Sequence, residues 1–348
     1  MTTIALDCMG GDHGVEEAVA GAAALSTERD DIRVILVGDV GELGPALDSL
    51  SYNPSHLSIR HAVDWVSNDE SPRAALEAKP EASILQACRL VAEGRADALV
   101  TAGSTGAAIL AADRCLGRIP GVHRAALAAV TPTELSHGPK DDPFALLLDV
   151  GATLHVSPRD LVTFAVMGSA YAAAISGNPR PRVALLSNGR EAGKGPPEVV
   201  EAHRLLQAVE GLDFVGNVEG LDIPRGTVDV VVTSGFLGNV VLKMIEGIGE
   251  VIADLASDAY ARKFLWRLGL TMLSSGIREI ESVMDWEYYG GAPILGFRQP
   301  VIKAHGRSRR RALTNACKVA AKAARSDMVG VIEASVSGLP PEDAETGA

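Results

Sequence analysis

The chain has 348 residues, of which 47% are hydrophobic and 22% are charged, and its formal net charge is −12. This is enough apolar material for a large core, and the acidic balance argues against nucleic acid as the main partner. No run of 18 apolar residues occurs, and the start MTTIALDCMGGD lacks the basic and apolar regions of a secretory signal. We therefore expect a cytoplasmic protein that does not span a membrane.

The cysteines and histidines show no spacing that is typical of a metal site. The four cysteines are far apart and form no Cys-x-x-Cys pair, and the eight histidines include no His-x-x-x-His pair. We interpret the cysteines as small buried residues in a reducing compartment, with a catalytic thiol at Cys8 as the alternative. The sequence thus predicts neither a metal nor a cofactor.

In the first two thirds of the chain, short apolar runs alternate with segments of helical spacing. Eight apolar runs predict strands at 3–8, 32–38, 57–63, 97–103, 144–151, 181–187, 212–218 and 228–234. Helices are predicted at Ser83–Glu93, Thr105–Cys115, Pro158–Ile175 and Pro196–Glu210. Nearly continuous apolar strands between helices indicate an α/β fold, with a mostly parallel sheet that is covered on both faces.

The turns after these strands are the places where a ligand is expected, because open α/β sheets bind ligands beyond the carboxyl ends of their strands. Five of these turns are rich in Gly and small polar residues, which is more than the connections require. We expect them along one edge of the sheet. They are Asp7–Gly14, Thr101–Gly106, Asp149–Thr153, Ser187–Gly195 and Thr233–Asn239.

The segment from about 239 to 284 breaks the alternation and predicts a long helical excursion. Within it, Lys263, Arg267 and Thr271 recur at every fourth position and form a polar stripe between large apolar residues. Such a face packs in a core or at a dimer interface. It also fits a helix that lies in a membrane interface at 262–273. Both interpretations remain open.

The last part of the chain is unevenly charged. A strand-like run, PVIKAH, leads into KAHGRSRRR, which carries five basic residues and no acid between Lys303 and Arg311. A phosphate ligand, an acidic partner protein, an anionic membrane surface or a solvated helix start would each explain this run. The last eighteen residues, 331–348, carry four acids and no base, and we expect an acidic tail.

Several short motifs, taken in order, resemble the phosphate acyltransferase family. The opening ALDCMGGDHG is followed by LVAEGRADALVTAGSTGA, LLLDVGAT, FAVMGSAYA and PRVALLSNGREAGKG, and then by VDVVVTSGFLGNVVLK, YYGGAPILG and VIKAHG. Each motif alone is weak. Their shared order and spacing over nearly the whole chain identify it as similar to this family.

The resemblance implies an α/β/α sandwich like isopropylmalate dehydrogenase and phosphotransacetylase. It also implies a homodimer and peripheral association with a membrane. We expect residues 1–330 to form one two-lobed catalytic domain, from which the helical excursion protrudes. The implied reaction transfers a fatty acyl group from acyl carrier protein to inorganic phosphate, and the acyl phosphate then enters phospholipid synthesis.

The chain departs from the family pattern at several turn residues. Ser234 replaces an Asp, Thr153 replaces an Asn, and Ser187 and Arg190 lie in an altered turn. These changes favour a second hypothesis, a catalytically altered scaffold that binds carrier protein or membrane. A third hypothesis is a nucleotide-dependent dehydrogenase of the same fold, but no Gly-x-Gly-x-x-Gly turn follows the first strand.

The implied reaction needs a site that binds a hydrated anion and stabilises the oxyanion of a thioester carbonyl. Backbone N–H groups of glycine turns, together with Lys and His side chains, meet that need. As catalytic residues we predict Lys303, His305, Lys194 and Asn239. As substrate-binding residues we predict Asp7, Gly10, Gly11, Asp12, His13, Lys79, Ser83, Ser104, Thr105, Gly106, Asp149, Gly235 and Gly238.

Purely structural roles remain open for several of these residues. Asp12 and Ser104 are each suited to capping the helix that follows, and Asn239 to capping the long helical segment. Lys194 has the alternative of an ordinary solvated lysine. His305 is weighed against the common structural histidine at a strand end, and we favour the functional role.

Overall fold

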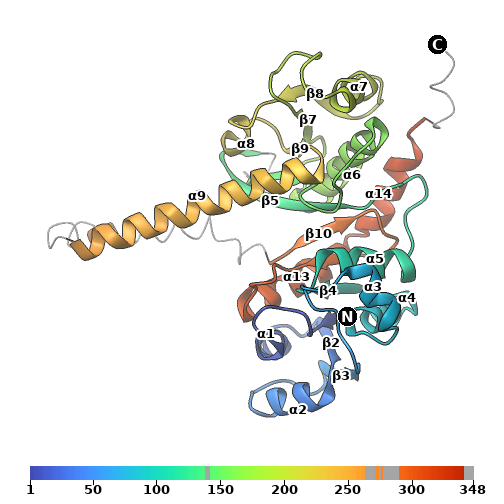
Figure 1. Ribbon diagram of the computed structural model, residues 1–348, viewed down its shortest axis with the longest axis vertical. Coiled ribbons are helices and arrows are strands. Elements are labelled where there is room, and N and C mark those ends of the chain that lie inside the picture. The colour runs from blue at the N-terminus through green and yellow to red at the C-terminus, as the bar shows by residue number, and fades with distance from the viewer. Residues whose placement is uncertain (138–141, 263–270, 274–275, 277–289, 341–348) are drawn as a thin grey trace.

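A computed structural model describes residues 1–137, 142–262, 271–273, 276 and 290–340, and shows an α/β fold built around one large sheet (Figure 1). The strands are β1 (Thr2–Asp7), β2 (Ile32–Gly38), β3 (Leu57–His61), β4 (Ala98–Thr101), β5 (Ala126–His137), β6 (Asp142–Leu148), β7 (Arg182–Leu186), β8 (Asp213–Val218), β9 (Val230–Val232), β10 (Ala292–Leu295) and β11 (Val301–Lys303). The helices are α1 (Val15–Glu28), α2 (Val40–Asp48), α3 (Pro72–Ala78), α4 (Ser83–Ala92), α5 (Thr105–Cys115), α6 (Pro158–Ser176), α7 (Pro197–Leu206), α8 (Asp222–Arg225), α9 (Gly235–Arg262), α13 (Arg310–Arg325) and α14 (Met328–Ser337).

The sheet consists of two sets of parallel strands that are joined by antiparallel pairs. Its order is β3-β2-β1-β4-β11-β10-β5-β6-β9-β7-β8. The first five strands are mutually parallel, and so are the last four. Between them, β10 is antiparallel to both β11 and β5, and β5 is antiparallel to β6. The predicted mostly parallel sheet is confirmed, whereas β5 and β10 were not predicted.

The three antiparallel steps reverse the direction of the second parallel set relative to the first. The carboxyl ends of β1, β4 and β11 therefore point to one edge of the sheet, and those of β6, β7 and β9 to the opposite edge. The prediction that all five glycine-rich turns lie along one edge is therefore wrong, although Thr105, Val150 and Asn239, from three of these turns, line one cavity. Strand direction depends on the two short connecting strands, and the turn sequences carry no information about it.

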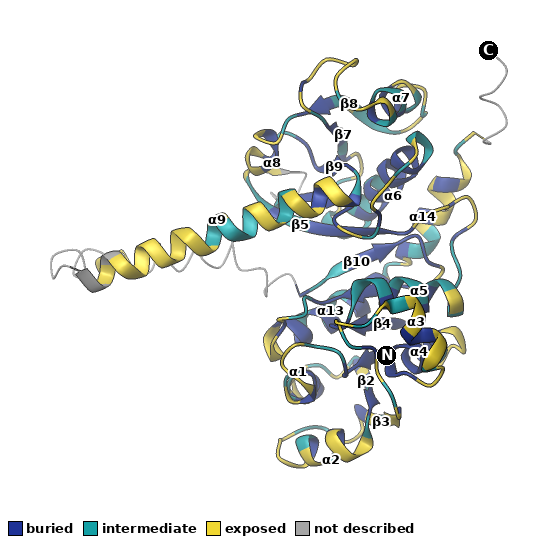
Figure 2. Cartoon of the chain, viewed as in Figure 1, coloured by how far each residue is buried: buried dark blue, intermediate teal, exposed yellow. Residues whose placement is uncertain are grey.

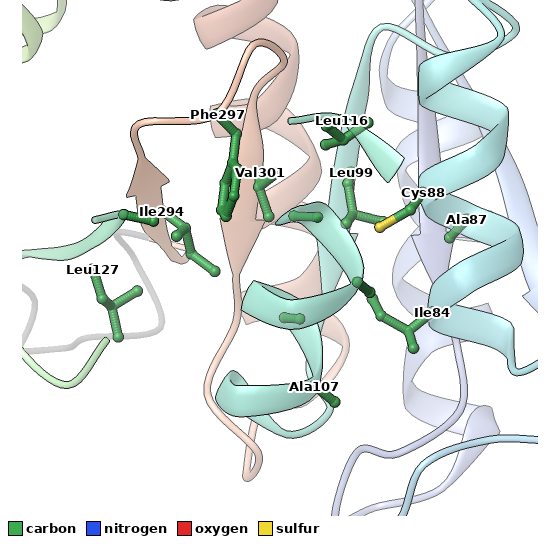
Figure 3. Packing of buried hydrophobic residues seen from close by; sticks show 14 of the residues in the cluster. Ile84, Ala87, Cys88, Leu99, Ala107, Leu116, Leu127, Ile294, Phe297 and Val301 are labelled. Carbon is green, nitrogen blue, oxygen red and sulfur yellow. The ribbon is translucent and has the colours of Figure 1, made fainter. Parts of the chain in front are cut away.

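Helices cover both faces of the sheet because neighbouring strand residues point to opposite sides. On β4, Leu99 packs with α4 and α5 in one apolar cluster, while Ala98 and Val100 pack with α1 and α13 in another. Figure 3 shows Leu99 near Cys88 and Val301 within the first cluster. A third cluster lies between α6 and the second set of strands. These layers hold the strand ends in fixed positions.

The predicted helix starts agree closely with the structure. Residues 83, 105 and 158 each begin a helix as predicted. The first turn of α6 has a reciprocal capping box, in which Ser157 and Asp160 satisfy each other's backbone N–H groups. The proline at its first position loses no intrahelical hydrogen bond. Local sequence therefore specifies these ends.

Helix α9 leaves the body of the molecule and points away from the sheet (Figure 1). Its inner end lies against β5 and β6, whereas its outer half is coloured as exposed in Figure 2. It begins at Gly235, four residues before the predicted excursion, and most of the predicted membrane segment 262–273 lies outside the described residues. In the described part of the chain, no helix is both long and apolar enough to cross a bilayer.

The packed part of the chain extends beyond residue 330. Helix α14 buries Met328, Ile332 and Val336 in contact with α6. Only the end of the predicted acidic tail, residues 341–348, lies outside the described residues.

Candidate functional site

A cavity of about 310 Å³ opens where the end of β11, the first turns of α9 and the middle of the sheet meet. Its apolar wall comes from β5, β10 and the turn after β6. The polar side chains come mainly from α9 and from the segment after β11. The lining residues that carry chemistry are Thr105, Asn239, Lys243, Glu246, Lys303, His305 and Ser308.

Lys303 is the last residue of β11 and only 8% of it is exposed. Its ammonium group donates hydrogen bonds to the carbonyl oxygens of Ala102, at 3.1 Å, and of Ala304. Burial lowers the pKa of Lys303 to about 8, and the carboxylates of Asp12 and Asp7 oppose this decrease. The ammonium group is therefore charged at neutral pH, and its third N–H remains for a ligand.

His305 and Lys243 place two hydrogen-bond donors beside each other at the cavity. The Nδ1 atom of His305 accepts from the backbone N–H of Arg307 at 3.1 Å, so in the neutral ring the proton is on Nε2. Burial lowers the pKa of His305, and the charge of Lys243 lowers it further, which favours the neutral ring. Nε2 lies 3.3 Å from the Nζ atom of Lys243, which is also 2.8 Å from Oε2 of Glu246. These two donors are too close for an oxygen to fit on the line that joins them, so an oxyanion would accept from both only from beside the pair.

Ser308 contributes a hydroxyl group that lacks a partner. The side chain is 3% exposed, lines the cavity, and its Oγ atom makes no hydrogen bond to any described residue. A buried polar group without a partner costs about 1–3 kcal/mol. Native structures rarely leave such a group unsatisfied unless a ligand or water completes it. Ser308 is therefore an independent indication that the cavity binds a polar ligand.

Asn239 and Thr105 form the rest of the polar lining. The amide of Asn239 donates to the carbonyl oxygen of Val150 at 3.0 Å, which holds it beside the cavity. Asn239 does not cap α9, because that helix begins at Gly235. Thr105 is the first residue of α5, and Ser104 caps this helix by accepting from Ala107 at 3.5 Å.

The oxygens of the Asp149 carboxylate already accept hydrogen bonds from its own turn and from β5. It is fully buried, burial raises its pKa, and its hydrogen bonds are 2.7–3.0 Å long. The donors are the backbone N–H groups of Leu127, Gly151, Ala152 and Thr153, and the hydroxyl of Thr153. A Cβ at Gly238 would lie 1.9 Å from the Asp149 carbonyl oxygen, and one at Gly235 would lie 2.3 Å from that of Thr153. These residues form the joint that seats α9 on the sheet.

The first glycine turn lines a separate cavity of about 390 Å³ that includes Gly10 and Gly11. Its lining contains the carboxylates of Asp12, Glu42 and Asp69, and no Lys, Arg or His among the described residues. His13 is exposed and is not among the lining residues. An anion there would face charges of its own sign.

Asp12 does not cap α1. The N-cap of that helix is Gly14, and it makes no side-chain capping bond. Asp12 instead accepts a hydrogen bond from Asn68 at 3.0 Å, and its backbone N–H donates to Gly306 at 2.9 Å. It thereby links the first turn to the segment after β11.

Four further predicted residues, Asp7, Lys79, Ser83 and Gly106, are not in the lining of the cavity at the end of β11. Asp7 accepts from the hydroxyl of Thr101 at 2.8 Å and also interacts with Ser83, and burial raises its pKa. Lys79 donates to Glu70 at 2.7 Å and to a backbone carbonyl. Gly106 packs closely against Pro72, where an added Cβ would lie 3.0 Å away.

The altered turns of the second strand set surround another cavity of about 390 Å³. Ser187 and Ser234 line it together with apolar side chains from α6, α7 and α9. Lys194 is exposed. It lines neither this cavity nor the cavity that contains Lys243, Lys303 and His305, which we call the basic cavity. Arg190 forms an ion pair with Asp222 at 2.7 Å.

The structure thus brings together Lys303, His305, Asn239 and Thr105, and it separates them from the first glycine turn and from Lys194. Sequence reasoning missed Lys243, Glu246 and Ser308. The first two had a usable signal, since they follow Asn239 by four and seven positions and so share one helical face. Ser308, a lone serine in a basic run, had none.

Comparisons with known proteins agree over nearly the whole chain. Residues 2–330 match a family model described as fatty acid synthesis protein. A phosphate acyltransferase from Heliobacterium modesticaldum is 42% identical, over 96% of this chain and 98% of the relative. One from Myxococcus xanthus is 44% identical, over 90% and 87%. A phosphotransacetylase structure from Streptococcus pyogenes is 17% identical and superimposes with a TM-score of 0.64, over 93% of this chain and 94% of that one, which supports the predicted fold.

Proposed function

Since the chain belongs to the phosphate acyltransferase family, we propose that it transfers a fatty acyl group from acyl carrier protein to inorganic phosphate. A phosphate oxygen forms a bond to the thioester carbonyl carbon, and the carbon–sulfur bond breaks. Hydrogen phosphate and thioester give acyl phosphate and thiol, so the proton carried by phosphate ends on the sulfur. No metal or redox partner is needed to balance this reaction.

The convergence of donors at the basic cavity carries the proposal. Lys303, Lys243 and His305 come from two distant segments and line a space of about 310 Å³. Two cations and a neutral imidazole N–H suit an anion better than any other small ligand. Partial exclusion of water strengthens each of these interactions.

The same groups suit both ends of the transfer. Phosphate is already anionic and nucleophilic at neutral pH, so the protein needs to orient it rather than activate it. We assign stabilisation of the oxyanion that forms on the carbonyl carbon to the N–H of His305 and the ammonium of Lys303, which both line the cavity. The apolar wall from β5 and β10 provides a surface for the acyl group.

The direct test uses the purified protein with long-chain acyl carrier protein and phosphate. We expect acyl phosphate to form, and Lys303→Ala to reduce kcat/KM about a hundredfold, the usual effect of removing one preorganised donor. Lys318→Ala is the matched control, because that lysine forms an exposed ion pair with Glu28 elsewhere on the surface. A fully active Lys303→Ala enzyme would remove this residue from the site.

The scaffold hypothesis predicts a different result in the same assay. A catalytically altered protein would bind carrier protein and form no acyl phosphate. The altered residues Ser187 and Ser234 line a cavity other than the basic one, so they leave the convergent donors in place. This separation favours the enzyme.

Acyl carrier protein is the proposed acyl donor, and the exposed arginines that follow Lys303 are its proposed docking surface. Arg307, Arg309, Arg310 and Arg311 are exposed beside the segment that lines the cavity. A basic patch next to an anion site would guide an acidic donor to it. This combination makes a protein donor more plausible than a small neutral thioester.

A second copy of the chain is the proposed partner of α9. Its exposed apolar side chains alternate at spacings of three and four, as in helices that pair side by side, at Met244, Ile248, Val251 and Leu255. A seam of this length on a projecting helix calls for a covering surface. Peripheral contact with a membrane through 262–273 remains a separate proposal, supported here by the exposed Met272 and Leu273.

A further inference from the structure

One carboxylate lies in the cavity among groups that otherwise attract anions. Glu246 is one turn beyond Lys243 on α9, its side chain is 21% exposed, and it lines the cavity. Its Oε2 atom accepts from Lys243 at 2.8 Å. A carboxylate has two oxygens that only accept hydrogen bonds, so Glu246 keeps capacity for another donor. A simple anion trap would not include this group, because like charges that face each other are unfavourable.

The chemistry of phosphate explains why a carboxylate belongs there. At neutral pH, inorganic phosphate keeps at least one P–OH group, because it has three acidic protons and only two are lost there, the second near about 6–7 by analogy with phosphate esters. Sulfate carries no proton under these conditions. A P–OH group donates to a carboxylate, whereas every sulfate oxygen would repel it.

Ser308 adds a second group that suits a protonated oxyanion. Its buried hydroxyl has no partner among the described residues, and it can both donate and accept. It can donate to an ionised oxygen while Glu246 accepts from the protonated one. Lysine side chains alone cannot make this distinction, because they have donors only.

We propose that Glu246 and Ser308 make the cavity select a protonated oxyanion, namely inorganic phosphate in preference to sulfate. The carboxylate of Glu246 accepts a hydrogen bond from the P–OH group, and the hydroxyl of Ser308 donates to an ionised oxygen of the bound anion. The inference rests on the proposed function, since it concerns the acceptor of that same reaction. It goes beyond it by assigning specificity to two residues outside the set of converging donors.

The test measures anion binding by calorimetry at pH 7, with the full chain and without any acyl donor. We expect phosphate to bind at least about tenfold more tightly than sulfate, the difference expected for one hydrogen bond to a charged group. In Glu246→Gln, whose amide can donate to sulfate, we expect the two affinities to differ by less than about threefold. Glu250→Gln is the matched control, because Glu250 is the next acid on α9 and pairs with the exposed Arg307. It should keep the preference of the unmodified chain.

Ser308→Ala provides an independent arm. Removing a buried hydroxyl that lacks a partner relieves its desolvation cost, so the variant should melt no lower than the unmodified chain and bind phosphate about tenfold more weakly. Equal binding of phosphate and sulfate by the unmodified chain would overturn the inference. An undiminished preference in Glu246→Gln, folded as judged by circular dichroism, would do the same.

The calorimetry also separates this inference from the proposed function. Selective phosphate binding without acyl transfer would contradict the enzyme and leave the specificity assignment standing. Acyl transfer with unselective anion binding would contradict the specificity assignment alone.

Discussion

Lys303 keeps a positive charge at a position where burial opposes it. The residue is almost fully buried at a strand end, and its pKa falls from the ordinary 10.5 to about 8. Asp7 and Asp12 limit the fall, although Asp7 is not in the lining of the cavity and Asp12 lines a different one. Their contribution to phosphate binding is therefore indirect, through the charge of Lys303.

This lowered pKa predicts how phosphate affinity depends on pH. The ammonium loses its proton as pH rises through about 8, so the KM for phosphate should be constant near pH 7 and about tenfold higher at pH 9, where about one tenth of Lys303 remains protonated. Initial rates at varied phosphate between pH 6.5 and 9.5 measure this. Lys303→Arg, which stays charged, should abolish the rise, and a flat profile in the unmodified enzyme would exclude Lys303 as the titrating group.

The same shift has a consequence for stability with the opposite sign to that of a salt-bridged lysine. The unfolded chain binds a proton at Lys303 up to its ordinary pKa of 10.5, whereas the folded chain releases it near 8. Between these values the unfolded state carries more protons. This group therefore makes the free energy of unfolding increase as pH rises from about 8 towards 10.5.

The site roles of single residues were predictable where the local sequence marks the end of a strand. Lys303 and His305 stand after an apolar strand and before a basic helix start, so both strand position and charge pointed to them. Ser308 was not predictable, because its significance is an unpaired hydroxyl that only the folded surroundings define. Asp149 was predicted for the right turn, but its oxygens are filled by that turn's own N–H groups.

At the scale of elements, α9 joins two roles that the sequence presents separately. Its first turns supply Asn239, Lys243 and Glu246 to the cavity, and its outer turns expose an apolar seam. The seam follows the three-and-four spacing of paired helices rather than covering the helix all round. A helical partner explains this spacing better than a lipid surface does.

Charge placed on the seam should dissociate the proposed homodimer. Val251→Glu puts a carboxylate in the middle of the seam, where pairing would bury it without a partner, so we expect the monomer to predominate at micromolar concentrations. Ala253→Glu adds the same charge two residues away on an exposed part of the helix and should remain dimeric. Sedimentation velocity distinguishes the two species. Equal sedimentation of both variants as dimers would exclude the seam as the interface.

Helices whose first turns carry strong local signals were predicted from the sequence. Strands that form only because they pair with neighbouring strands were not. Helices α4, α5 and α6 begin at the predicted residues because their first turns carry the signals for it. Strand β5 contains Pro132 and a polar second half, and β10 has four residues, so neither reads as a strand alone. Pairing with β6 and β11 makes them strands.

At the scale of the whole molecule, a locally basic region lies on a protein whose net charge is negative. The chain is acidic overall, with a net charge of −12, yet the cavity and the segment that follows β11 are basic. An acidic body repels an acidic partner except where the basic surface faces it. This arrangement favours one docking orientation and speeds association at low salt.

Neutralising the basic run should therefore weaken the binding of the acyl donor, acyl carrier protein, and leave the binding of the acceptor, phosphate, unchanged. In Arg309→Gln/Arg310→Gln/Arg311→Gln, we expect the KM for acyl carrier protein to rise about tenfold at low ionic strength, and its salt dependence to flatten, because steering is lost. The KM for phosphate should not change. Arg180→Gln/Arg204→Gln/Arg225→Gln removes the same charge from exposed positions on the other strand set and should behave like the unmodified enzyme. Unaltered donor kinetics in the first variant would exclude this docking surface.

The layered architecture was predictable from the sequence, but the relative direction of the two sets of parallel strands was not. Alternating apolar strands and helices predicted the layers, and the layers are present. The reversal between the two strand sets came from β5 and β10, which the pattern did not reveal. Turns that looked equivalent in the sequence therefore open into three different cavities, of which one is basic.

Helix α9 has 28 residues and is about 42 Å long, and its first turns are held tightly against the sheet. There Gly235 and Gly238 fit against the Asp149 turn so closely that no side chain can be added. A rigid helix that is fixed near one end transmits movements of its outer turns to its inner turns, and the inner turns of α9 form one wall of the cavity. A partner bound to the outer turns of α9 would therefore also restrict movement of Asn239, Lys243 and Glu246 relative to Lys303, which would tie the geometry of the cavity to the outer end of the helix.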